Sequence, residues 1–331
     1  MAVLVTGGAG YIGSHMVWAL LDAGEDVVVI DRLSTGFEWA VAPEAKLVIG
    51  DIADKDTVMA VIRDNDVDSI IHFAGSIVVP ESVADPLSYY ENNTTNSRTL
   101  IEAAVRTGVR HFIFSSTAAV YGSVGAEPVK EDHARNPDSP YGMSKLMTEI
   151  ILADVARAHD FSFTALRYFN VAGADPRGRA GQSTAGATHL IKVASEAALG
   201  KRDGIQVFGT DYPTADGTCI RDYIHVTDLA EAHLLALKRL RAGGDSMIAN
   251  CGYGRGYSVL EVLDCIQRVT GRALDIGYGP RRAGDAVAIV ANSDLARSAF
   301  GWQPRHDDLT EIVSSALAWE DSLSRRNSAD R

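Results

Sequence analysis

The sequence predicts an α/β fold, in which a doubly wound parallel sheet is followed by a smaller C-terminal α/β lobe. Three observations predict it. A short strand runs directly into a glycine-rich turn and an amphipathic helix at residues 3–20. Unalternated apolar runs, typical of strands buried on both faces, recur through the first half of the chain, and helical stretches separate them. We therefore expect a Rossmann-type domain over residues 1–175 and a second lobe over residues 176–331, with some strands and helices crossing back between them.

The turn after the first strand carries three glycines, Gly7, Gly10 and Gly13. Glycines let a backbone turn tightly and approach a pyrophosphate, and the first amides of the following helix point at its negative charge. The spacing differs from the commoner G-x-G-x-x-G, and glycine turns between strands and helices are frequent. In this strand–turn–helix context, the segment predicts a bound dinucleotide.

The later elements alternate in the order that a doubly wound sheet requires. The expected strands cover residues 26–30, 46–49, 69–73, 111–114 and 163–166. The expected helices among them cover residues 56–63, 96–107 and 144–159. Residues 175–187, rich in Gly, Arg and small residues, predict a loop, and helices are expected in the second lobe at 228–241 and 258–270.

The composition is that of an ordinary soluble enzyme, since 46% of the 331 residues are hydrophobic and 22% are charged. Acidic residues outnumber basic ones 43 to 31, which argues against nucleic acid or an anionic membrane as a partner. The three cysteines are widely spaced, so neither a disulfide framework nor a metal site is expected. No apolar run approaches membrane-spanning length and the first strand leaves no room for a signal peptide, so the expected location is the cytoplasm.

Asp31 follows the second expected strand, where a carboxylate can accept hydrogen bonds from the adenosine ribose hydroxyls. A carboxylate there also repels a 2′-phosphate, which favours NAD over NADP. Arg32 beside it could neutralise such a phosphate, and a solvated acid at a strand end is the alternative interpretation. NAD is the expected cofactor.

Tyr141 and Lys145 are four residues apart, a spacing that places two side chains on one face of a helix. A free tyrosine titrates near pH ~10, but a nearby ammonium and a cationic nicotinamide ring would both favour the phenolate. Lowering the pKa of the phenol by about three units requires roughly 4 kcal/mol. Alone, Y-x-x-x-K is more often a surface helix pair. Together with the glycine turn and the strand end at 114–117, it predicts a catalytic pair.

Motifs along nearly the whole chain carry a family resemblance. They are GGAGYIGSH from Gly7, GDI from Gly50, IHFAG from Ile71, FSSTAAVYG from Phe114, SPYGMSK from Ser139, LRYFNVAGA from Leu166, DYPTADGTCIRDYIHVTDLA from Asp211 and PRRAGD from Pro280. In this order they resemble the extended short-chain dehydrogenase/reductase family and, within it, the UDP-sugar 4-epimerases. The resemblance implies NAD-dependent interconversion of UDP-glucose and UDP-galactose at C4 through a 4-keto intermediate.

The resemblance also implies a role for individual residues. Tyr141 would be the base, Thr117 would hydrogen-bond the 4-hydroxyl of the sugar, and Lys145 would hold the nicotinamide ribose. The implied cofactor-binding residues are Gly7, Gly10, Tyr11, Ile12, Gly13, Asp31, Asp51, Ile52, Phe73, Ala74, Gly75, Asn92, Ser115, Tyr141, Lys145 and Tyr168. The implied substrate-binding residues are Thr117, Tyr141, Asn170, His189, Leu190, Phe208, Arg221, Arg282, Asp285 and Ile289. Family members commonly dimerise through two helices, here near 92–107 and 144–157, so a homodimer is expected.

The chain departs from the family pattern at three positions. Ile77 replaces a lysine that reaches the cofactor, which bears on how tightly NAD is retained. Thr117 replaces a serine, and His189 stands where asparagine is common. Ile289 is intermediate between a bulky aromatic residue, which blocks N-acetylated sugars, and a small one, which admits them, so glucose and galactose are the expected sugars.

Several alternative functions share this fold and cofactor. Nucleotide-sugar 4,6-dehydratases carry an adjacent Asp-Glu pair where this chain has Ala118 and Ala119, so their acid–base groups are lacking. An epimerase for pentose or N-acetylhexosamine sugars and a nucleotide-sugar reductase remain alternatives. A non-catalytic NAD-binding protein would have no reason to keep Thr117, Tyr141 and Lys145 together.

Overall fold

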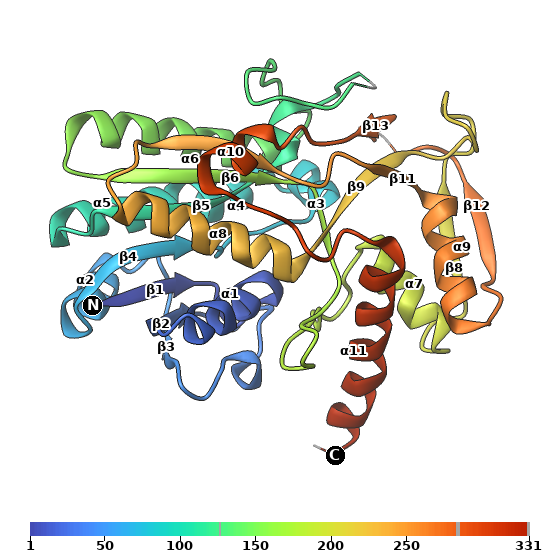
Figure 1. Ribbon diagram of the computed structural model, residues 1–331, viewed down its shortest axis with the longest axis horizontal. Coiled ribbons are helices and arrows are strands. Elements are labelled where there is room, and N and C mark those ends of the chain that lie inside the picture. Colours follow the sequence, from blue (N-terminus) through green and yellow to red (C-terminus); the bar gives the residue numbers. More distant parts are fainter. Residues whose placement is uncertain (126, 283–284, 330–331) are drawn as a thin grey trace.

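The computed structural model describes residues 1–125, 127–282 and 285–329. Within these residues, seven parallel strands form the central sheet, in the order β10-β6-β5-β4-β1-β2-β3 (Figure 1). The strands are β1 (Ala2–Thr6), β2 (Asp26–Asp31), β3 (Lys46–Ile49), β4 (Val67–His72), β5 (His111–Thr117), β6 (Ser162–Tyr168) and β10 (Met247–Cys251). The predicted doubly wound parallel sheet is confirmed.

Helices cover both faces of this sheet. Met16 and Leu20 of α1 (Tyr11–Asp22) share one buried cluster with Leu229 and Leu237 of α8 (Val226–Arg241). The opposite face is covered by α2 (Lys55–Asp64), α5 (Asn96–Thr107) and α6 (Pro140–Ala158). Two apolar layers of this kind explain why the strand sequences do not alternate.

The second half of the chain returns to the first sheet. Both α8 and the edge strand β10 come from beyond residue 225, and β10 pairs in parallel with β6. The pattern of the sequence did not predict β10. The division of the chain at residue 175 stays a prediction.

A smaller lobe lies beyond the carboxyl ends of the central strands (Figure 1). Its sheets join β11, β9 and β13 with β7, and β12 with β8. The strands are β7 (Asn170–Ala172), β8 (Ile205–Phe208), β9 (Ile220–His225), β11 (Gly256–Ser258), β12 (Ile276–Gly279) and β13 (Ala288–Ile289). Its helices are α7 (Leu190–Ala198), α9 (Val259–Thr270) and α11 (Leu309–Ala329), which share one apolar core.

Short segments complete the fold. They are η1 (Glu38–Ala40), α3 (Val79–Ala84), α4 (Pro86–Tyr89), η2 (Tyr90–Thr95), η3 (Ala118–Tyr121) and α10 (Asp294–Phe300). None of the helices in the described part of the chain is long and apolar enough to span a membrane.

The start of α6 differs from the prediction in a way that matters for the site. The helix begins at Pro140, four residues before the predicted start at Ser144. The Ser139 side chain accepts a hydrogen bond from the Gly142 amide at 3.2 Å, and proline suits the first helical position because it has no amide to satisfy there. This cap places Tyr141 within the first turn of α6.

Candidate active site

The glycine turn between β1 and α1 has the close contacts that a dinucleotide site requires. Gly7 has φ +71°, and a Cβ there would lie 2.7 Å from the amide nitrogen of Ala74. A Cβ at Gly13 would lie 2.1 Å from the Gly7 carbonyl oxygen, so only glycine lets α1 approach the turn. Gly10 caps α1 without any side-chain hydrogen bond, which leaves amides at this helix end for an anion. These residues fit the pyrophosphate of NAD.

Asp31 lies beside this turn at the end of β2. Its carboxylate accepts hydrogen bonds from the amides of Ala9, at 3.0 Å, and Leu33, at 2.8 Å. Each carboxylate oxygen has further lone pairs, so the group can still accept from ribose hydroxyls. The neighbouring Arg32 is paired with Asp51 at 3.5 Å, which joins two segments that each carry an implied cofactor-binding residue.

Tyr141 is buried at the carboxyl end of β5. Its side chain interacts with that of Thr117, the last residue of β5. Burial raises the pKa of the Tyr141 phenol, and the interaction with Thr117 partly opposes this rise. The protein by itself therefore does not lower the pKa of Tyr141, whereas the sequence predicts a lowered pKa for the site with NAD bound. Lowering it would require the added positive charge of the nicotinamide.

Lys145 lies one turn further along α6 and is also buried. Its Nζ donates to the Ser115 carbonyl at 3.1 Å and lies 5.0 Å from the centre of the Phe114 ring. Burial lowers the pKa of Lys145 to about 8. A Cβ at Gly75 would lie 3.5 Å from Nζ, so the turn after β4 runs past the ammonium. The hydroxyls of Ser115 and Tyr168 hydrogen-bond one another beside this group.

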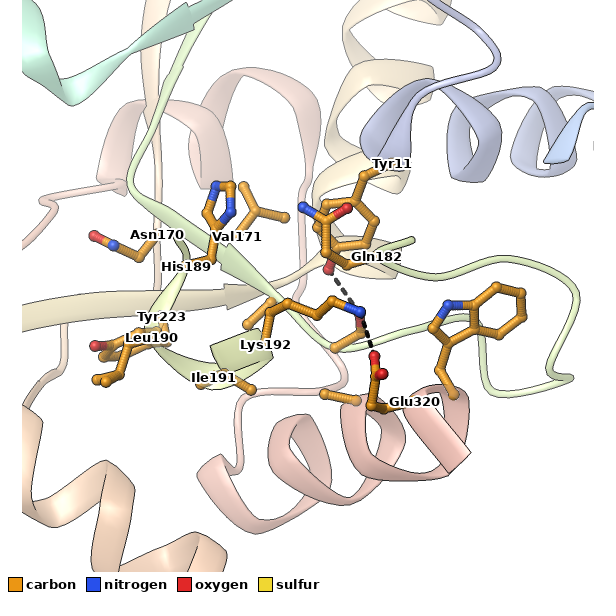
Figure 2. A pocket seen from close by; sticks show the side chains of 14 residues that line it. Tyr11, Asn170, Val171, Gln182, His189, Leu190, Ile191, Lys192, Tyr223 and Glu320 are labelled. Carbon is orange, nitrogen blue, oxygen red and sulfur yellow. Dashed lines mark hydrogen bonds and ion pairs between the residues drawn. The ribbon is translucent and has the colours of Figure 1, made fainter. Parts of the chain in front are cut away.

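Several of the predicted substrate residues line a pocket that Tyr11 also lines (Figure 2). Asn170 of β7, His189 and Leu190 line it, together with Lys192 and the Tyr11 ring. The Nδ1 atom of His189 is buried and has no hydrogen-bond partner in the described structure. Burial lowers the pKa of His189, which favours the neutral ring. Tyr141, Thr117 and Lys145 do not line this pocket.

The remaining predicted substrate residues gather near the N-terminal end of β9. Arg221 and Arg282 both reach the carboxylate of Asp285, at 3.6 and 2.8 Å. The Arg282 guanidinium lies 5.1 Å from the centre of the Phe208 ring. Arg221 lies two residues before Tyr223, which lines the pocket, so this cluster adjoins the pocket along β9. Ala283 and Gly284 of the PRRAGD motif lie outside the described residues.

Ile289 pairs with Arg221 in the small sheet and packs against an apolar cluster that includes Ala118 and Phe169. Ala118 and Ala119 themselves form the start of η3, directly after Thr117. Neither side chain can exchange a proton. These two positions therefore supply no acid or base beside Thr117.

Comparison with known proteins gives a consistent result. Residues 3–252 match the NAD dependent epimerase/dehydratase family. The chain belongs to this family. It is 56% identical over 321 residues to UDP-glucose 4-epimerase of Azospirillum brasilense, covering 97% of this chain and 92% of that one.

Solved structures of family members extend the comparison. UDP-glucose 4-epimerase from Brucella ovis in complex with NAD has a TM-score of 0.93 at 44% identity, covering 96% of this chain and 97% of that one. The same enzyme from Bifidobacterium longum, in complex with NAD⁺ and UDP, has a TM-score of 0.93 at 36% identity. That match covers 97% of this chain and 98% of the other.

Within this family fold, sequence reasoning missed two positioning groups. The first is Asn93, in the π-helical turn η2, whose side chain bonds the Ser76 amide at 2.7 Å and the Ser144 hydroxyl at 3.1 Å. Its neighbour Asn92 donates to the Ser76 hydroxyl at 2.8 Å, and its predicted contact with the cofactor stays a prediction. Nothing local distinguishes the two asparagines, because a π-helical turn has no sequence signature.

The second missed group is the buried ion pair of Glu149 and Arg167, 2.6 Å apart and each 1% exposed. Glu149 also accepts from the Ser116 hydroxyl at 2.5 Å. The pair thus joins α6, β5 and β6 directly behind the residues that face the site. A charged residue within an apolar strand, Arg167 in β6, was the available signal.

Proposed function

We propose that this protein is an NAD-dependent UDP-glucose 4-epimerase. The observation that carries the proposal is the grouping of Tyr141, Thr117 and Lys145 at the carboxyl end of β5, at the same edge of the parallel sheet as the glycine turn after β1. The family membership and the near full-length likeness to UDP-glucose 4-epimerases support it.

The glycine turn, Asp31 and Lys145 would hold NAD, with the pyrophosphate at the N-terminus of α1 and the nicotinamide ribose beside Lys145. When bound, NAD would take hydride from C4 of the sugar and return it to the opposite face, so that the sugar passes through a 4-ketone. Because the ketone stays in the site, its reduction is effectively unimolecular.

Tyr141 would remove the proton from the sugar O4 and later return it. Its phenol is buried and its pKa is raised by that burial, so positive charge is needed nearby to form the phenolate. Lys145 supplies one such charge from the next turn of the same helix. The Thr117 hydroxyl, which interacts with the phenol, would hydrogen-bond the reacting oxygen.

The UDP part of the substrate would occupy the pocket around Asn170 and the arginine cluster beside it. Arg221 and Arg282 come from separate segments and supply local positive charge in a protein of net charge −12. The medium-sized Ile289 would leave room for glucose and galactose and restrict N-acetylated sugars. Equal turnover of both sugar classes would contradict this assignment of Ile289.

The test is to mix the purified protein with UDP-galactose, quantify UDP-glucose, and follow the absorbance of reduced nicotinamide. The proposal expects sugar interconversion with no stoichiometric gain or loss of NADH. Accumulation of NADH in proportion to product would instead make the protein a dehydrogenase. Absence of any sugar product at every NAD concentration would favour a different nucleotide sugar.

We also propose a homodimer in the cytoplasm. Apolar side chains are exposed along neighbouring helices, Val83 and Leu87 on α3 and α4 and Met147 and Ile150 on α6. Leu87 is 77% exposed, and exposed apolar side chains on helices that contact one another are typical of a protein–protein contact. Sedimentation of the wild type and of Leu87→Glu/Ile150→Glu tests this. A dimeric wild type and a monomeric variant are expected, and a monomeric wild type would contradict it.

A further inference from the structure

Residues 175–184, which we call the strap, run between α1 and α11 (Figure 1). One end is fastened to α1. The Asp175 amide donates to His15 Nε2 at 3.1 Å, and the Arg179 guanidinium binds the Asp22 carboxylate at 3.0 Å. The same guanidinium lies 4.5 Å from the centre of the Trp18 ring.

The other end of the strap is held by Trp319 of α11. A Cβ at Gly181 would lie 2.2 Å from Trp319 Cγ, so the strap backbone rests directly on the indole ring. The indole Nε1 donates to the Ser183 hydroxyl at 3.2 Å. Trp319 also stacks on Trp39, with ring centres 6.3 Å apart, and Trp39 stacks on Phe37. The C-terminal helix therefore ties the strap to the segment that follows Asp31.

Between these two attachments the strap faces the glycine turn. Gly10, Tyr11 and Ser14 line one side of a cleft, and Gly181, Ser183 and Thr184 of the strap line the other. Phe37, the outer member of the aromatic stack, lines the same cleft. The strap thus lies across the N-terminus of α1, where the anion-binding amides are.

We propose that the strap retains the cofactor, and that Trp319 is the positioning residue that holds it in place. NAD in this cleft would be released only when the strap separates from Trp319, so the Gly181–Trp319 contact controls the release rate. The inference rests on the proposed function, because it takes NAD as the occupant of the cleft. The strap would also help to retain NAD in a chain that has the uncharged Ile77 in place of a lysine that reaches the cofactor. Ile77 is 51% exposed.

The decisive variant is Gly181→Ala. Its Cβ would collide with the indole, while the φ of Gly181 is outside the left-handed region, so alanine brings no backbone strain. The matched control is Gly125→Ala, whose Cβ would enter open space. Each protein is loaded with NAD and passed through a desalting column, and the nucleotide still bound is quantified against time. Release is expected to be at least about tenfold faster from Gly181→Ala and unchanged in the control.

Two further variants test the hydrogen bond alone. Trp319→Phe keeps a ring against Gly181 but lacks the donor, and Ser183→Ala lacks the acceptor. Both should speed release by the same factor, about fivefold, and the double variant should be no faster than either. A purely structural role would lower the thermal midpoint without altering release. If Gly181→Ala does not fold, the pair of hydrogen-bond variants decides.

The possible failures can be distinguished. A wild-type protein that binds no NAD would contradict the proposed function itself. A wild type that retains NAD, with Gly181→Ala and Ser183→Ala releasing it at the wild-type rate, would overturn the role of the strap.

Discussion

At the scale of single residues, the Tyr141 hydroxyl is the group on which the proposed chemistry depends. Tyr141→Phe removes one oxygen from a buried ring and leaves the packing intact. We expect turnover of UDP-galactose to fall by about 10²–10⁴-fold, while binding of NAD and UDP is retained. Steady-state rates and calorimetric affinities measure the two effects. Tyr278→Phe, at a side chain 60% exposed, is the control, and turnover near the wild-type rate in Tyr141→Phe would refute the assignment of the base.

Lys145 makes the stability of the cofactor-free protein depend on pH. Its pKa is lowered from 10.5 to about 8 by burial, so the unfolded chain binds more protons than the folded one between these values. The cost of burying the charge is present in full below pH 8 and disappears as the pH rises toward 10.5. Wild type should therefore gain stability relative to Lys145→Met across this window, by up to about 3 kcal/mol. Urea unfolding at pH 7.5 and 10.5 measures the difference in free energy of unfolding between the two proteins. The same difference at both pH values would argue against a buried ammonium.

At the scale of elements, the Glu149–Arg167 pair holds α6 against β5 and β6. Glu149→Gln leaves the Arg167 charge buried without its partner, which should lower the free energy of unfolding by about 3–5 kcal/mol. Breaking the exposed pair of Asp264 and Arg268 on α9, by Asp264→Asn, should cost less than about 0.5 kcal/mol. Denaturant unfolding compares the two variants.

The same pair offers an internal check on the physical argument. Replacing both Glu149 and Arg167 by methionine removes the unpaired charge as well as the attraction. This double variant should therefore be more stable than Glu149→Gln alone. If the double variant and Glu149→Gln lose the same free energy of unfolding, the pair stabilises the protein through packing and not through charge.

At the scale of the whole molecule, the first sheet depends on elements from the second half of the chain. The layer over one face includes Leu229 and Leu237 of α8, and Ala249 of β10 lies in the same cluster. A chain ending at residue 175 would lack this part of the layer, so the apolar face of the sheet beneath it and the edge of β6 would be exposed. We expect it to show no cooperative thermal transition by circular dichroism, whereas the full chain should show one. A sharp transition in the shortened chain would mean that the division at residue 175 separates two independently folding units.

The parallel sheet and the glycine turn could be predicted from the sequence, and the motif residues could be named as candidates for the site. These features are local or periodic: buried parallel strands produce apolar runs, and a tight turn against a helix requires glycine at fixed positions. The motifs around Tyr141 and Asp31 lie within such elements, so their identity could be read along the chain. The family resemblance of these motifs extended the prediction to the residues that would bind UDP.

Which distant segments meet became known from the folded molecule. It returned β10 to the edge of the first sheet, bonded the Asn93 side chain to the Ser76 amide, and placed Trp319 of the last helix against Gly181. Such contacts depend on the packing of whole elements, and no local propensity or period encodes them. The pKa of Tyr141 shows the same limit, because the burial that raises it is a property of the folded molecule and not of the Y-x-x-x-K spacing.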